Sequence, residues 1–92
     1  MTRDHAERIA IDVLGFLATD PVRLQRFLAL SGLEAGHLRE AAQEPAFLAG
    51  ILAHVAGDER TVVDFCEASG HPTEAPGEAL KALGGGNSWG SV

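Results

Sequence analysis

The chain has one cysteine and four histidines, the side chains from which a reactive centre or a metal site would most readily be built. Cys66 precedes Glu67 and His71, and a neighbouring imidazolium would lower the pKa of a thiol and make it nucleophilic. However, Cys66 follows Phe65 on an apolar stripe, where a thiol acts as a small apolar side chain, and His71 lies beyond the helix-ending Gly70. The sequence therefore favours a structural thiol, and an enzyme or redox thiol at Cys66 is the third of three interpretations.

The histidines lie in four different segments, and none has another histidine four residues away to complete a metal site on one helix face. They are His5, His37, His54 and His71. The glycine run 84–86 follows a predicted helix rather than a strand, and no Lys-Ser or Lys-Thr pair follows it as in a phosphate-binding loop. We therefore predict no catalytic, cofactor-binding or metal-binding residues.

The segment 24–38 has the outline of a helix-turn-helix motif. Gly32 would form the turn, and Leu33 and Leu38 would be the buried residues of a second helix that enters the major groove of DNA. Two features oppose this interpretation. Leu28 occupies the position four residues before the glycine, where a close helix crossing prefers a small side chain, and the second helix would bring three glutamates toward phosphates. Weak nucleic-acid binding through this segment is therefore the alternative interpretation.

Helices must position all of these residues, because apolar side chains recur at three- and four-residue spacings and no segment alternates with period two. Asp20 and Asp58 are predicted N-caps, and Gly32 and Gly70 are predicted helix ends. We expect helices over about 4–18, 20–32, 34–43, 44–57, 58–70 and 73–83. The fourth is the predicted core helix, and the fifth is predicted to turn Val62, Val63, Phe65 and Cys66 inward. The expected fold is all-α, a compact bundle of five or six short helices.

The length of 92 residues is enough for one core, so we predict a single helical domain over residues 4–83 and a disordered Gly/Ser-rich tail over 84–92. The net charge of −6 disfavours nucleic acid as a partner. No apolar run approaches the roughly 18 residues of a membrane span, and the N-terminus lacks the apolar stretch of a signal peptide. We therefore expect a cytoplasmic protein without membrane contact, and a single cysteine fits that reducing compartment.

A partial repeat runs through the chain. Aligning 20–32 with 58–70 pairs Asp20 with Asp58 and Gly32 with Gly70, and also matches the phenylalanines and serines between them. Each copy follows an apolar helix and precedes a short one. Two three-helix pseudo-repeats would explain this pattern, and so would the shared chemistry of any two helices with an Asp cap and a Gly end.

Several short motifs in the sequence resemble those of a known family. They are Ala18-Thr19-Asp20-Pro21, then Arg26-Phe27-Leu28-Ala29-Leu30-Ser31-Gly32-Leu33, then Glu44-Pro45-Ala46-Phe47-Leu48, then Asp64-Phe65-Cys66. In this order they resemble short alphaproteobacterial proteins catalogued as domain of unknown function 3572, over residues of about 6–83. The resemblance implies no activity, cofactor or site residue.

By exclusion, the sequence predicts a protein-interaction module without catalytic activity, which binds an unknown protein partner or a second copy of itself. Val22 and Ala29 are candidate contacts because they fall on the side of the second helix opposite its apolar stripe. Trp89 is a third candidate, since tryptophan is enriched among the residues that dominate binding energy at interfaces.

Overall fold

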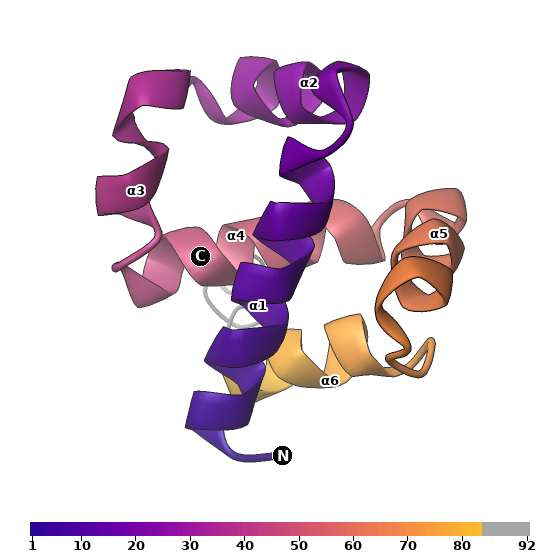
Figure 1. Ribbon diagram of the computed structural model, residues 1–92. Coiled ribbons are helices and arrows are strands. Elements are labelled where there is room, and N and C mark those ends of the chain that lie inside the picture. The colour runs from indigo at the N-terminus through magenta and orange to yellow at the C-terminus, as the bar shows by residue number, and fades with distance from the viewer. Residues whose placement is uncertain (84–92) are drawn as a thin grey trace.

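The computed structural model describes residues 1–83, and the predicted tail 84–92 lies outside the described residues. Within residues 1–83 the chain forms six α-helices and one 3-10 turn and no strand (Figure 1), which confirms the all-α prediction. The elements are α1 (Arg3–Ala18), α2 (Pro21–Ser31), the 3-10 turn η1 (Ala35–His37), α3 (Leu38–Ala41), α4 (Pro45–Ala56), α5 (Glu59–Ser69) and α6 (Ala75–Ala82).

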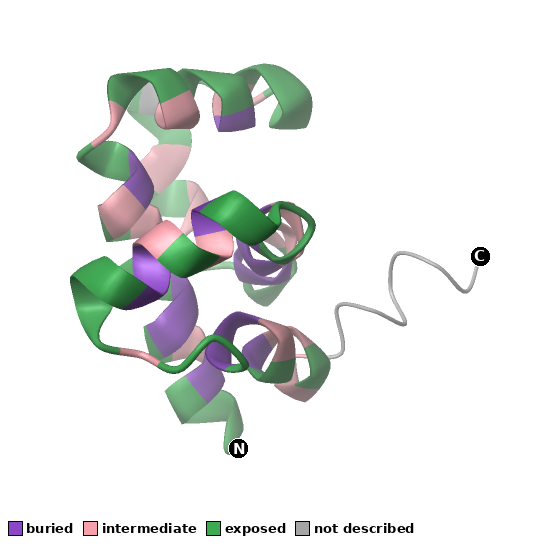
Figure 2. Ribbon diagram, turned by 90° about the vertical axis from the view of Figure 1, so that its right-hand side faces the viewer, coloured by how far each residue is buried: buried purple, intermediate pink, exposed green. Residues whose placement is uncertain are grey.

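The core lies where α1, α4 and α6 pack together, with α5 against α4 and α1, and α2 against α1. Figure 2 shows the buried residues gathered on the inner faces of these helices. Helix α4 is mostly apolar and five of its residues are buried, which confirms it as a core helix. The buried apolar residues are Ala6, Ile9, Ala10, Val13, Leu17, Phe27, Leu48, Ala49, Ile51, Leu52, Val55, Phe65, Cys66, Ala75 and Ala79.

The two predicted caps and the two predicted helix ends are confirmed. The Asp20 carboxylate accepts the backbone N–H groups of Val22 and Arg23, and the Asp58 carboxylate accepts that of Arg60. These bonds satisfy amides that a helix leaves without partners in its first turn. Gly32 and Gly70 end their helices at φ of 73° and 84°, a left-handed conformation that glycine adopts without steric cost.

The third predicted helix is much shorter than expected. Instead of a helix over 34–43, the structure has the turn η1 followed by the four-residue α3, which has no fully buried residue. The residue before α3, His37, makes no side-chain cap bond, and Gly36 adds backbone entropy that disfavours a helix. Helix nucleation is costly, so a short segment without a buried face does not extend.

The prediction for the inner face of α5 was wrong at one residue. Val63 is 39% exposed, whereas Thr61 is buried and its hydroxyl donates to the Asp58 carboxylate at 2.8 Å. Thr61 and Phe65 stand four residues apart on one helix face, and Cys66 continues it, so Val63 falls outside the arc that faces the core. Val62 is half-buried.

The partial repeat is reproduced in local geometry. Helices α2 and α5 each have 11 residues, an Asp N-cap and a left-handed Gly C-cap. In each, the serine before that glycine donates its hydroxyl to a backbone carbonyl of the last turn. The likeness ends at the following segment, because α6 packs on α1 and α4 whereas α3 has no comparable packing. The structure therefore reproduces the caps, the serines and the buried phenylalanines of the repeat, but not a matching third helix.

Candidate functional site

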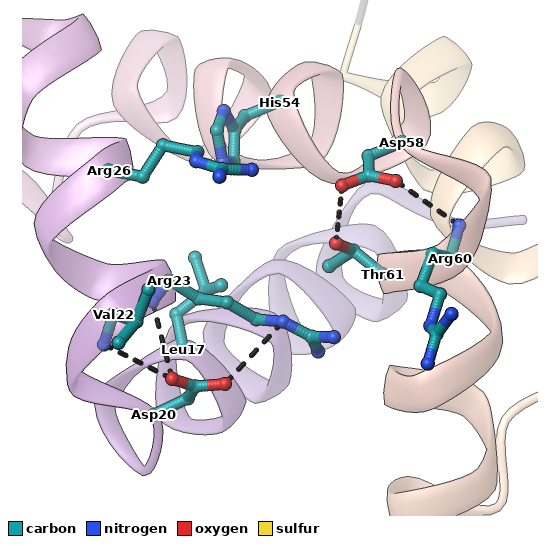
Figure 3. Close-up of a pocket in the computed structure, with 9 residues that line it drawn as sticks. All are labelled: Leu17, Asp20, Val22, Arg23, Arg26, His54, Asp58, Arg60 and Thr61. Atoms are coloured by element: carbon teal, nitrogen blue, oxygen red, sulfur yellow. Dashed lines mark hydrogen bonds and ion pairs between the residues drawn. The ribbon is translucent and has the colours of Figure 1, made fainter.

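A pocket of about 260 Å³ opens between the start of α2, the end of α4 and the start of α5 (Figure 3). Three of the chain's six arginines line it, although the protein as a whole is acidic. The two capping aspartates, Asp20 and Asp58, line it as well. The pocket therefore combines charges of both signs, and its chemistry depends on which of them already have partners.

Arg23 is already paired. Its guanidinium bonds the Asp64 carboxylate of α5, lies 3.5 Å from a carboxylate oxygen of Asp20, and sits over the ring of Phe16 at 5.5 Å. The hydrogen bond to Asp64 raises the pKa of Arg23 above its ordinary value, so this cation is fixed and neutralised locally. Arg23 consequently ties α2 to α5 and is not available to a ligand.

Arg26 forms no ion pair within 4.0 Å among residues 1–83, and it lies exposed on α2. Figure 3 shows its side chain reaching from α2 toward His54 of α4. Burial lowers the pKa of His54 below its ordinary value, and the nearby Arg26 adds to this effect against the opposing influence of Asp58. At neutral pH the histidine is therefore uncharged, and Arg26 supplies the positive charge at this point.

An apolar groove of about 590 Å³ begins at the same histidine and runs between α2 and α4. Its floor is an aromatic cluster in which the ring of Phe27 meets that of Phe47 at 5.8 Å and that of His54 at 5.2 Å, both edge to face. Leu30 stands at its edge with 73% of its surface exposed. The groove is lined by Phe27, Leu30, Ser31, Ala46, Phe47, Gly50, Ala53 and His54. Because His54 belongs to both, the groove and the pocket form one continuous surface, hereafter the α2–α4 surface.

The structure places two of the three predicted partner contacts. Val22 is 73% exposed and lines the pocket, and Ala29 is exposed on the same helix, so the predicted outer face of α2 is confirmed. Trp89 lies outside the described residues. Leu30 was not predicted, although it stands eight residues after Val22 and four after Arg26, a spacing that places all three along one side of the helix.

The predicted structural role of Cys66 fits its surroundings. The thiol is buried and donates to the carbonyl of Pro72 at 3.3 Å. Burial raises the pKa of Cys66 above its ordinary value, which disfavours the reactive thiolate. His71 lies near it in sequence but bonds the Asp12 carboxylate at 3.0 Å and stacks on Phe65. The thiol and the imidazole are therefore each bonded to another group in this structure.

The helix-turn-helix outline is not built as the sequence suggested. Gly32 does end α2, but the segment after it forms η1 and the single-turn α3 rather than a recognition helix. Leu33 and Leu38, which the motif would bury, are half-buried. No group of three or more His, Cys, Asp or Glu side chains within residues 1–83 is arranged to hold a metal ion. None of the described helices is both long and apolar enough to span a membrane.

The fold and the α2–α4 surface define a small helical domain that exposes an apolar groove beside an unpaired arginine. A family model described as "Protein of unknown function (DUF3572)" matches residues 3–86, and the chain belongs to this family. This match confirms the family resemblance that was inferred from the motifs around Asp20-Pro21 and Phe65-Cys66. No curated protein and no solved structure matches the chain.

Proposed function

We propose that this protein is an interaction module that binds a protein partner through the α2–α4 surface and has no catalytic activity. The observation that carries the proposal is Leu30, a large apolar side chain 73% exposed beside a groove with an aromatic floor. Burying a leucine side chain contributes about 1.5–3 kcal/mol, so a partner that covers Leu30 and the groove gains from apolar contact. Val22 lies on the same side of α2 and would extend the contact.

The absence of catalysis is part of the proposal because the one thiol and the histidine nearest to it in sequence are both occupied. Cys66 donates to a backbone carbonyl, and His71 is bonded to Asp12. We also propose that the protein acts in the cytoplasm, because a chain with one cysteine suits a reducing compartment.

The test is capture of partners from the cells that produce the protein, with two matched variants. Leu30→Asp places a charge at the edge of the groove, and Ile11→Asp places the same charge on α1, where Ile11 is 45% exposed and outside the α2–α4 surface. Both sites are exposed, so circular dichroism should show both variants folded. We expect wild type and Ile11→Asp to retain the same partner and Leu30→Asp to lose it.

Two results would contradict the proposal. If Ile11→Asp lost the partner and Leu30→Asp retained it, the interface would lie on α1 instead. Capture of the chain itself, with a solution mass that Leu30→Asp halves, would replace the protein partner with a second copy.

A further inference from the structure

The two helices that frame the groove carry no negative side chain. The chain has 13 acidic residues, and none of them lies within Pro21–Ser31 of α2 or Pro45–Ala56 of α4. The acids nearest in sequence are the N-cap residues Asp20, Glu44 and Asp58, which stand at the ends of helices. The groove of this acidic protein is therefore lined without an acid. The adjoining pocket has two, Asp20 and Asp58, and both already accept hydrogen bonds within the chain.

Arg26 places the unpaired positive charge of α2 at one end of the groove. It stands four residues after Val22 and four before Leu30, so its charge interrupts a row of two side chains that are each 73% exposed. Since Arg23 is bound by Asp64, the unpaired charge that α2 offers to a partner is Arg26. It lies at the His54 end of the groove, where the apolar lining gives way to the polar pocket.

We infer that the partner docks an acidic amphipathic helix on this surface, with apolar side chains in the groove and a carboxylate at Arg26. This inference rests on the proposed function and names the chemistry of its partner. A groove between two helices is a common receptor for one helical face of a partner, and a carboxylate matches the planar guanidinium with two parallel hydrogen bonds. Charge complementarity then fixes the orientation of the docked segment.

A second copy of the chain fits this surface poorly. A two-fold axis close to Arg26 would bring the two copies of this arginine together, and neither α2 nor α4 carries an acid within its bounds to pair with them. The two aspartates of the adjoining pocket already accept bonds within their own chain. Nucleic acid also fits poorly, because affinity for phosphates grows with the number of cations in contact. This face offers two arginines without an ion pair among residues 1–83, Arg26 and Arg60, beside two aspartates and an uncharged histidine.

The experiment is a selection from a displayed library of random 16-residue peptides, with the full chain as bait and Leu30→Asp as counter-bait. The enriched peptides are then synthesised and their binding is measured by fluorescence anisotropy. We expect them to combine apolar residues at helical spacing with a negative net charge. Arg26→Glu should weaken their binding by about tenfold and should itself select basic peptides. Arg39→Glu makes the same change in charge on α3, outside the groove, and should leave the binding unchanged.

The outcomes separate this inference from the proposed function. Enriched peptides that Leu30→Asp releases but that are neutral or basic would overturn the acidic partner and leave the interaction module standing. A library that yields no peptide sensitive to Leu30→Asp would contradict both the acidic partner and the interaction module. A labelled 20-base-pair DNA duplex that binds the wild type, competes with the peptides and is released by Arg26→Glu would replace the acidic helix with nucleic acid.

Discussion

The same chemical change, glycine to alanine, should have opposite effects on stability at Gly15 and at Gly70. Gly15 lies inside α1 in ordinary helical geometry, and a Cβ placed there meets no atom within 4 Å. Alanine is better than glycine in a helix interior by about 0.8–1.0 kcal/mol, so Gly15→Ala should raise the free energy of unfolding by that amount. Gly70 also has open space around its Cβ position, but its φ is 84°. A left-handed non-glycine residue costs about 1–2 kcal/mol, partly offset because alanine restricts the unfolded chain, so Gly70→Ala should lower stability by about 1 kcal/mol.

Urea unfolding followed by circular dichroism at 222 nm measures this difference, provided that the slope with denaturant is the same in all variants. The two variants should differ by roughly 2 kcal/mol, and each kcal/mol should move Tm by about 4–8 °C in a domain of this size. Gly32→Ala, at a φ of 73°, should behave like Gly70→Ala. A stabilising Gly70→Ala, or a destabilising Gly15→Ala, would refute the assignment of one as a helix end and the other as a helix interior.

Three further predictions address the core, the half-buried His54 and the thiol. Phe65→Ala should destabilise the protein by about 3–5 kcal/mol, because the ring is fully buried and meets Phe16 edge to face at 5.7 Å; urea unfolding would contradict this with a loss below about 1 kcal/mol. Because burial lowers the pKa of His54 below 6.5, the unfolded chain binds a proton more readily, and stability should fall as pH drops below about 6.5. His54→Gln should show a smaller loss between pH 7.5 and 5.5, and an equal loss would count against the histidine. Cys66 should react with iodoacetamide more slowly than free cysteine, because burial raises the pKa of its thiol, and faster labelling would restore the redox interpretation.

Local signals made most of the fold predictable. An aspartate before a helix and a glycine after it act within a few residues, so the bounds of α2 and α5 follow from Asp20, Gly32, Asp58 and Gly70. The apolar stripe of α4 likewise identified the core helix. The third segment was overestimated because its apolar residues had the right spacing, whereas a helix also needs a neighbour against which that face can be buried.

The site was less predictable because it depends on contacts between residues far apart in the chain. The exposed side of α2 could be expected from its periodicity, and Val22 and Ala29 are exposed there as predicted. Their role as partner contacts stays a prediction. The groove could not be expected from periodicity, because its floor forms where Phe27 of α2 meets Phe47 and His54 of α4. Arg23 and Arg26 look alike in the sequence. Only the structure shows that Arg23 is paired with Asp64, whereas Arg26 forms no ion pair among residues 1–83.

The helix that carries the proposed interface is also the one with the fewest buried residues among the longer helices. Phe27 is the only buried residue of α2, whereas α1 and α4 each bury five. The position of α2 therefore depends on its Asp20 cap, its Gly32 end and the Arg23 contact with Asp64, in addition to Phe27 and the half-buried Leu24 and Leu28. Elements with few buried contacts open at lower free energy than the whole domain. Weakening these supports should open the groove before it unfolds the core. Under the proposed function, stability at the α2 caps and affinity for a partner at Leu30 should therefore change together.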